Sequence, residues 1–344
     1  MRVAYTLEQC WHRVPGGTGV AALHVARAMA GHPEVELVGV AGRHPQPPAD
    51  PWVPPIPVRQ LPLAAPWLYE TWLRAAWPKV ERATGPVDVA HATTLIPCPA
   101  DAPVVVTLHD LAFLHEPEHF TRHGVRVFQR SLGAIRRHAR LVLCCSHATM
   151  DDAVAAGIPA DRVRFVPLGV DADRVDDAAV RAVRATYSLP DEFVLFVGTV
   201  EPRKNLRGLV DALALLPDAP PLVVVGADGW GDTGVVASAD VRFLGFVPAA
   251  HLGALYAAAT VFAYPSLREG YGLPVLEAMA QGTPVVTSSG TATEETAGGA
   301  AVLVDPRHPA DIARGVSDAL TRPEQWSRPG SCAQRHSPGP PPPS

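Results

Sequence analysis

The chain has 344 residues, of which 47% are hydrophobic and 18% are charged, and its formal net charge is −5. This length exceeds the usual size of one hydrophobic core and predicts two domains of about 150 residues each. The negative net charge gives no reason to expect nucleic acid as a partner, and the absence of any apolar run of about 18 residues gives none to expect a membrane-spanning helix.

In the first half of the chain, short valine-rich runs alternate with longer amphipathic segments. This alternation is typical of parallel strands that are buried on both faces and covered by helices. The predicted strands are Arg2–Tyr5, Val35–Val40, Val87–His91, Val104–Leu108, Leu141–Cys145 and Val163–Pro167. The predicted helices are Gly19–Ala30, Trp67–Ala83, Val125–Ala139 and His147–Ala156.

The second half repeats the same alternation. Its predicted strands are Phe193–Gly198, Leu222–Gly226, Val241–Gly245, Val261–Tyr264, Pro284–Thr287 and Ala301–Val304. Its predicted helices are Leu206–Leu216, Ala249–Ala258, Leu273–Gln281 and Pro309–Leu320.

Two complete series predict an α/β protein with two doubly wound, Rossmann-like domains. We place the first domain at residues 1–170 and the second at 171–321, with the boundary near Gly169–Asp171. Ligands of such folds bind outside the carboxyl ends of the strands, so the active site is expected in a cleft between the domains.

Two proline-rich regions interrupt this pattern. Residues 45–66 contain nine prolines, which deny a helix or central strand its amide donors, and are predicted to form a long loop. Residues 322–344 are also rich in proline and lack an apolar period, so a disordered tail is predicted.

The cysteines and the first residues bear on the compartment. The five cysteines are odd in number and lack CxxC spacing, which argues against a disulfide framework, and the adjacent Cys144 and Cys145 are expected to be buried strand thiols. The chain begins with the strand-like MRVAYT rather than a signal sequence, so a cytoplasmic location is expected.

The segment PSLREGYGLPVLEAMAQ at Pro265–Gln281 carries the strongest chemical signal. A strand is predicted to end before it, and a helix to begin near Leu273 with Pro274 in its first turn. Free amides at that helix start form a site for anionic or hydroxyl-rich groups. Glu269 and Glu277 are placed to accept paired hydroxyls, although taken alone they are equally consistent with a turn carboxylate and a solvated helix residue.

The segment GTVEPRKNL at Gly198–Leu206 places Arg203 and Lys204 after another predicted strand and before a helix, with Asn205 as a predicted N-cap. A sugar–diphosphate bond that breaks leaves growing negative charge on the phosphate, and fixed cations stabilise that charge. By itself, the Arg-Lys pair also fits a solvated surface turn.

Together, GTVEPRKNL and the later EGYGLPVLEAMAQGTPVVTS resemble the family-four retaining glycosyltransferases of the GT-B architecture, whose hallmark is two glutamates separated by seven residues. The resemblance is strong over residues 193–306 and looser before them. It implies that Arg203 and Lys204 bind the donor diphosphate, Glu269 the sugar hydroxyls and Glu277 the ribose. It also assigns the turn and helix start Gly270, Tyr271, Gly272 and Leu273 to donor binding. One departure is Thr293 with Glu294, where the family commonly has Leu and Pro.

Two sites in the first domain fit this resemblance. The glycines of PGGTG, Gly16 and Gly17 among them, follow the first strand and would bring the backbone close to the donor phosphates, although the motif also fits a plain tight turn. His109 ends the strand Val104–Leu108 beside Asp110, where the family commonly has a histidine near the donor sugar. Without the resemblance, a His-Asp pair at a strand end fits a structural role as well.

Neither a metal ion nor a separate cofactor is expected, because the nucleotide sugar is a substrate. HEPEH at His115–His119 matches the HExxH pattern of zinc enzymes, but Pro117 would break the helix that this zinc site requires. The three tryptophans of Pro66–Val80 fit a helix packed on the sheet, or alternatively a peripheral contact at the inner face of the membrane.

The resemblance therefore implies a retaining hexosyltransferase that uses a nucleotide-diphosphate sugar. The resemblance favours a GDP-mannose-like donor over a UDP-sugar, and the acceptor is a glycan, a lipid-linked molecule or a small molecule. The alternatives are an epimerase or phosphorylase of the same fold, a sugar-binding module, or a transferase impaired by a truncated or frame-shifted end. The sequence does not indicate the oligomeric state.

Overall fold

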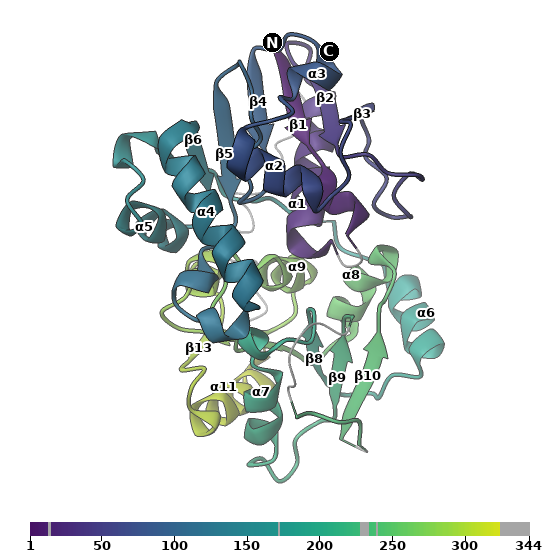
Figure 1. Cartoon of the computed structure of the whole chain (residues 1–344). Helices are drawn as coiled ribbons and strands as arrows, with labels where there is room; N and C mark the ends of the chain where they lie inside the picture. The colour runs from purple at the N-terminus through teal and green to yellow at the C-terminus, as the bar shows by residue number, and fades with distance from the viewer. Residues whose placement is uncertain (13–14, 171–172, 228–233, 239, 324–344) are drawn as a thin grey trace. The chain divides into compact units, whose positions relative to one another are not determined.

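The computed structural model describes residues 1–12, 15–170, 173–227, 234–238 and 240–323. The chain divides into two compact units, one formed by Met1–Val166 and the other beginning at Pro167 (Figure 1). The sequence placed this boundary four residues later, after residue 170. The predicted tail lies outside the described residues, apart from residues 322 and 323.

The first unit is built on one parallel sheet. Its strands, in the order β3-β2-β1-β4-β5-β6-β7, are β1 Arg2–Thr6, β2 Glu36–Ala41, β3 Val58–Gln60, β4 Val89–Ala92, β5 Val104–Leu108, β6 Ala139–Cys144 and β7 Val163–Phe165. Its α-helices are α1 Gly16–Ala30, α2 Trp67–Ala75, α3 Glu81–Thr84, α4 Arg122–His138 and α5 His147–Ala155.

This sheet is buried on both faces, as its continuous apolar strands predicted. Along β1, Val3 and Tyr5 belong to one buried cluster, whereas Ala4 between them belongs to another. Because successive side chains of a strand point to opposite faces, these two clusters are the two covered sides of the sheet.

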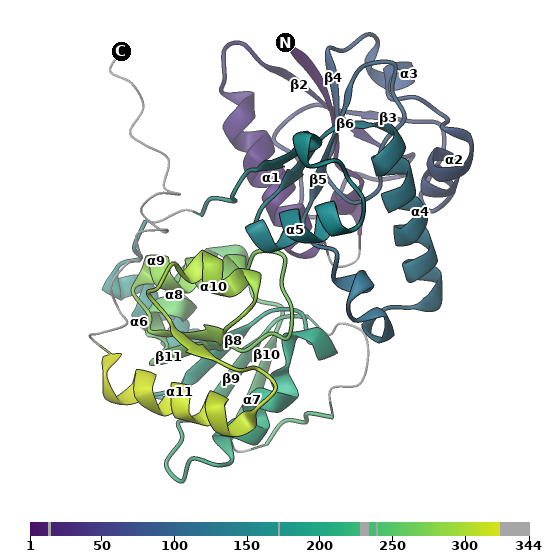
Figure 2. The ribbon, with the colours of Figure 1, turned by 90° about the vertical axis from the view of Figure 1, so that its left-hand side faces the viewer.

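The second unit repeats the arrangement with six parallel strands in the order β10-β9-β8-β11-β12-β13. They are β8 Val194–Val197, β9 Leu222–Val225, β10 Val241–Gly245, β11 Val261–Tyr264, β12 Val285–Ser288 and β13 Val302–Val304. The helices are α6 Asp177–Tyr187, α7 Leu206–Leu213, α8 Ala249–Ala258, α9 Leu273–Gln281, α10 Ala292–Ala297 and α11 Pro309–Thr321. Helix α7 packs against α11, and α6 packs against α8 (Figures 1 and 2).

Three predictions about the first unit are wrong in detail. The proline-rich region is not loop throughout, because Val58–Gln60 forms the edge strand β3. The predicted helix Trp67–Ala83 stops at Ala75, where Ala76 takes a left-handed conformation ahead of Pro78, and resumes only as the short α3. Helix α1 begins at Gly16 rather than Gly19, which places Gly16 and Gly17 in its first turn.

Candidate active site

The candidate site lies where the strand order of the second sheet reverses. Strand β8 pairs with β9 on one side and with β11 on the other, so the connections that leave β8 and β11 depart in opposite directions. Such a switch point leaves a crevice at the carboxyl ends of the two strands, where ligands of these folds bind. Both motifs that the sequence singled out begin there, one after β8 and the other after β11.

The turn that carries the two cations is anchored to the loop after β11. Residues Pro202–Lys204 form a single 3-10 turn, η5. Asn205 is the N-cap residue of α7, as predicted, but its side chain makes no capping hydrogen bond. Its amide Nδ2 instead donates to the carbonyl oxygens of Pro265, at 3.0 Å, and of Pro306, at 2.7 Å. The backbone N–H of Leu267 also donates to the carbonyl oxygen of Arg203, at 2.9 Å, so the turn with both cations is held against the loop after β11.

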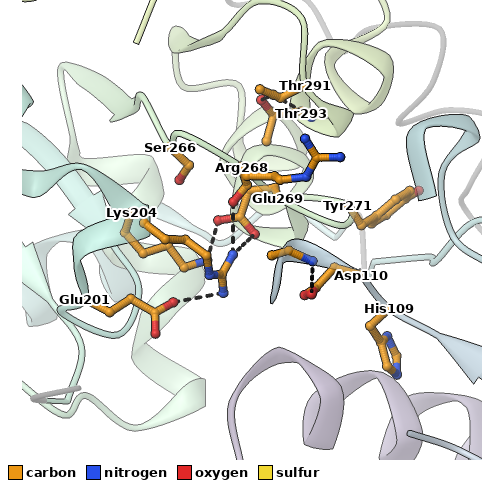
Figure 3. Close-up of polar contacts among 12 residues, drawn as sticks. His109, Asp110, Glu201, Lys204, Ser266, Arg268, Glu269, Tyr271, Thr291 and Thr293 are labelled. Carbon is orange, nitrogen blue, oxygen red and sulfur yellow. Dashed lines mark hydrogen bonds and ion pairs between the residues drawn. The ribbon is translucent and has the colours of Figure 1, made fainter. Parts of the chain in front are cut away.

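The structure brings both cations onto one carboxylate. Lys204 Nζ lies 2.5 Å from Glu269 Oε1, and Arg203 Nη1 lies 3.2 Å from Glu269 Oε2. On its other side, Arg203 Nη2 pairs with Glu201 Oε1 at 2.8 Å. The four side chains are between 2% and 14% exposed, so this is a desolvated network of two cations and two carboxylates (Figure 3).

The electrostatics of the network keep Glu269 ionised. Burial by itself raises the pKa of this carboxyl, but Lys204 and Arg203 more than offset burial and lower the pKa to about 2. Burial lowers the pKa of Lys204, and attraction by Glu269 opposes that change. At neutral pH the site therefore holds a carboxylate that is bound to cations on both of its oxygens.

A tyrosine that neither sequence motif includes joins the network from within the sheet. The ring of Tyr264, the last residue of β11, is fully buried beside Phe196 and Phe262. Its hydroxyl accepts a hydrogen bond from Lys204 Nζ at 2.5 Å and donates one to Glu269 Oε1 at 3.0 Å. Tyr264 thus fixes the ammonium and the carboxylate relative to the sheet.

The glycine turn before α9 has a tight packing requirement. Gly272 has φ +96°, and a Cβ at this position would lie 2.7 Å from the methyl carbon of Thr293. Its neighbour Tyr271 is buried and donates from its hydroxyl to the carbonyl oxygen of Leu168 at 2.7 Å. Helix α9 then begins at Leu273 with Pro274 in its first turn, as predicted. Gly270, which separates Glu269 from Tyr271 in the sequence, is also buried.

Glu277 lies farther along α9, in an environment unlike that of Glu269. Its Oε2 accepts a hydrogen bond from the hydroxyl of Tyr256, at 2.7 Å. Burial raises the pKa of Glu277, and the tyrosine hydrogen bond only partly counters that rise. The two glutamates of the motif are therefore a strongly ion-paired carboxylate and a carboxyl that is held by one neutral donor.

In the first unit, His109 follows β5 directly. Its Nε2 lies 3.0 Å from the carbonyl oxygen of Thr93, so this nitrogen carries the proton and Nδ1 is an acceptor. Burial lowers the pKa of His109, which favours the neutral ring. Gly16 and Gly17 lie in the first turn of α1, and a Cβ at either position would meet nothing within 4 Å.

The HEPEH segment does not form a helix. Its residues lie in and around the 3-10 turn Pro117–His119, where His115 pairs with Asp152 at 2.8 Å and His119 with Glu116 at 3.1 Å. Among the described residues, no three His, Cys, Asp or Glu side chains are grouped closely enough to hold a metal ion.

The tryptophan segment divides between the core and the surface. Trp72 is buried and its Nε1 donates to the carbonyl oxygen of Pro78, whereas Trp67 is 70% exposed. In the part of the chain that the structure describes, no helix has the length and hydrophobicity needed to cross a membrane.

Two family models match the chain, one over most of each half. Residues 15–174 match the family described as "Glycosyltransferase Family 4", and residues 191–322 match "Glycosyl transferases group 1". The chain belongs to the family-four glycosyltransferases. The resemblance that the two sequence motifs carry is therefore confirmed.

The family members that resemble this chain include mannosyltransferases. O-antigen chain mannosyltransferase B of Escherichia coli is 36% identical over 231 residues, which are 63% of this chain and 61% of that protein. D-inositol 3-phosphate glycosyltransferase of Geodermatophilus obscurus is 36% identical over 199 residues, which are 51% of this chain and 43% of that protein. The matched part of the chain thus spans less than two thirds of the length of either relative.

Solved structures confirm the fold class. Anabaena HepE in complex with UDP-glucose superposes with a TM-score of 0.73 at 22% identity, covering 98% of this chain and 96% of that one. Sucrose-phosphate synthase from Thermosynechococcus elongatus gives a TM-score of 0.75 at 21% identity, covering 98% and 94%. The predicted GT-B class, with two Rossmann-like domains, is correct.

Proposed function

We propose that this family member is a retaining glycosyltransferase that moves a hexose from a nucleotide-diphosphate sugar to an acceptor hydroxyl. The observation that carries the proposal is the convergence of Arg203, Lys204 and Glu269 at the switch point of the second sheet. This part of the second unit combines two cations, the start of a helix and a carboxylate, which suit a diphosphate joined to a polyhydroxyl ring.

Each side chain has one role in this proposal. Arg203 and Lys204 stabilise the negative charge that grows on the leaving diphosphate, and the amides of Gly270 to Leu273 support it. Glu269 accepts hydroxyl hydrogen bonds of the sugar, and Glu277 holds the ribose. By the family resemblance, His109 is proposed to bind a sugar hydroxyl, and Gly16 and Gly17 in the first turn of α1 to bind the phosphates.

Retention follows in this proposal from a front-face reaction. The acceptor hydroxyl attacks the anomeric carbon on the side from which the diphosphate leaves, and the departing phosphate oxygen takes the proton. Catalysis then rests on positioning and charge stabilisation rather than on a protein nucleophile. No metal ion is needed, because two side-chain cations supply the positive charge.

The donor and the acceptor are inferred from the relatives. The mannosyltransferase relatives favour a GDP-mannose-like donor, whereas the HepE complex with UDP-glucose keeps a UDP-sugar as the alternative. The glycosyltransferase relatives act on an O-antigen chain or an inositol phosphate by name, and a glycan, lipid-linked or small-molecule acceptor is proposed here.

A donor screen followed by turnover measurements tests the proposal. GDP-, UDP- and ADP-sugars are first compared by the rise in melting temperature that each one causes. With the best donor, E269A should abolish transfer, and R203A and K204A should each lower kcat/KM by roughly 10²–10³-fold. The matched control is R207A, which removes a cation that pairs with Asp211 on the exposed face of α7.

Three outcomes would reject this assignment. Full transfer by E269A would remove the glutamate from the site. Conversion of the donor without any acceptor would indicate an epimerase, and a requirement for inorganic phosphate would indicate a phosphorylase. The anomeric configuration of the product, read by NMR, tests retention separately.

A further inference from the structure

Glu269 occupies the two cations that the donor diphosphate is proposed to use. Each of its carboxylate oxygens faces one cation, Oε1 facing Lys204 and Oε2 facing Arg203. The carboxylate thus contacts the same two side chains that a bound phosphate group would bridge.

Charge balance makes this arrangement stable without a ligand. Adjacent residues Arg203 and Lys204 bring two positive charges into a region that is almost wholly removed from solvent. Buried charges are costly unless they are paired, and here Glu201 and Glu269 neutralise the two cations. A diphosphate brings at least two further negative charges into this balanced network, so it meets the repulsion of a carboxylate that has not moved.

The contacts of the network show which ion pair a ligand can replace. Arg203 keeps Glu201 at 2.8 Å and the carbonyl oxygen of Arg268 at 3.0 Å, and Lys204 keeps the hydroxyl of Tyr264 at 2.5 Å. Both cations therefore stay in position if Glu269 withdraws. Of the two carboxylates in the network, Glu269 is the one with a second proposed partner, the sugar hydroxyls.

We propose that Glu269 is an internal counter-anion that the donor diphosphate displaces from Arg203 and Lys204, and that this displacement releases the carboxylate to bind the sugar. The proposal rests on the proposed function and deepens it. It makes sugar recognition depend on diphosphate docking, so a free sugar or a sugar monophosphate is a poor ligand compared with a nucleoside-diphosphate sugar.

The test compares nucleotide and donor affinities by calorimetry at constant ionic strength. GDP and UDP are the probes, together with the donor sugar of whichever base binds. Removal of the competing charge in E269Q should tighten nucleoside diphosphate binding by about fivefold or more, and should abolish the extra affinity that the sugar gives the wild type. E269A, which has neither the charge nor an amide donor, should tighten binding in the same way.

The matched control is D211N. Asp211 pairs with Arg207 on the same domain and does not touch Arg203 or Lys204 in the contacts of the structure. D211N makes the same change in net charge, so it should leave nucleoside diphosphate affinity unchanged. The proposal is overturned if D211N tightens nucleoside diphosphate binding as much as E269Q does. It is also overturned if E269Q alone binds more tightly than the wild type, or if neither Glu269 variant does.

A wild-type crystal with GDP or UDP alone provides a second test that does not depend on how the variants fold. The Glu269 carboxylate should have left Arg203 Nη1, which is 3.2 Å away in the present structure, while Glu201 stays in place. Phosphate bound to both cations with both Glu269 contacts intact would refute displacement. If neither nucleotide binds the wild type, the proposed function itself fails, and displacement fails with it.

Discussion

Glu269 and Glu277 belong to one motif, yet their environments shift their acidities in opposite directions. Lys204 and Arg203 overcome burial and hold the pKa of Glu269 at about 2, whereas burial raises the pKa of Glu277. The reason is the charge of the groups beside each carboxyl. Two cations lower the pKa of Glu269, whereas only the neutral hydroxyl of Tyr256 acts against burial at Glu277. The same residue type is thus used for two different electrostatic roles.

Acid should weaken the fold through Glu269. Its folded pKa of about 2 lies below the ordinary value near 4.5, so its ionisation stabilises the fold above about pH 4.5. That contribution, on the order of 3 kcal/mol, is lost as the pH falls from about 4.5 to 2. Thermal melting of wild type and E269Q should show a gap at pH 6 that narrows toward pH 2. A gap that does not change with pH would show that Glu269 is not ion-paired in solution.

Glu277 should behave in the opposite way. Because its folded pKa is raised, its ionised form opposes folding at neutral pH, and its protonated form is favoured below the folded pKa. E277Q should therefore melt at or above the wild-type temperature at pH 7. If Glu277 holds the ribose, E277Q should nevertheless bind the nucleotide more weakly than the wild type does. A lower melting temperature in E277Q would contradict the pKa assignment, and unchanged nucleotide affinity would contradict the ribose contact.

Local sequence predicted these charged side chains but not their partners. Arg203, Lys204 and Glu269 were found because cations and carboxylates beside glycine turns suit phosphate and sugar chemistry. Tyr264 was predicted only as the end of an apolar strand, and its role depends on contact with Lys204, 60 residues away. Tyr256 was missed for the same reason, because its partner Glu277 lies 21 residues away. Glu201 lies within the first motif, two residues before its partner Arg203, and was not singled out.

At the level of elements, central strands were predicted well and marginal elements poorly. Buried parallel strands give continuous apolar runs, which the sequence displays directly. Strand β3 has only three residues, follows Pro57 and pairs with β2 alone, so its proline-rich surroundings concealed it. Helix α6 was missed because Val183 is its only buried residue and the helix also carries Asp177, Arg181 and Arg184. Its start is nevertheless capped by Asp176, whose side chain accepts from the amide of Ala179.

The turn that begins α9 should tolerate no side chain at Gly272. G272A places a Cβ 2.7 Å from the Thr293 methyl and imposes an unfavourable backbone conformation, since φ is +96°. We expect a loss of about 1–3 kcal/mol in the free energy of unfolding, measured by urea denaturation. The matched control is G290A, because Gly290 also has a positive φ but a Cβ there would meet no atom within 4 Å. G272A/T293S should recover the part that is due to the methyl clash, and a G272A effect no larger than that of G290A would exclude any such clash.

On the scale of the whole molecule, the two units repeat one topology with separate cores. Each has the strand order 3-2-1-4-5-6, with one further edge strand in the first unit, and this repeat is what the two sequence series predicted. The sequence could not specify more than this, because strand periodicity gives the layers but not the side-chain contacts at the switch point. The candidate site of the second unit is built entirely from residues after Pro167.

Chelation should leave the transferase reaction unaffected. In the proposed mechanism, Arg203 and Lys204 supply the positive charge that a divalent cation supplies in other phosphate-transferring sites. Turnover measured before and after dialysis against EDTA should agree within error, and added magnesium or manganese should not raise it. A loss on chelation that magnesium restores would show that the leaving diphosphate needs a metal ion.

The most direct test of the central claim is a crystal structure of the chain soaked with the nucleotide sugar that most raises its melting temperature. We predict that oxygens of the diphosphate lie within about 3 Å of the Arg203 guanidinium and the Lys204 ammonium, beside the start of α9. A donor bound elsewhere, with these two cations still on Glu269, would contradict the account.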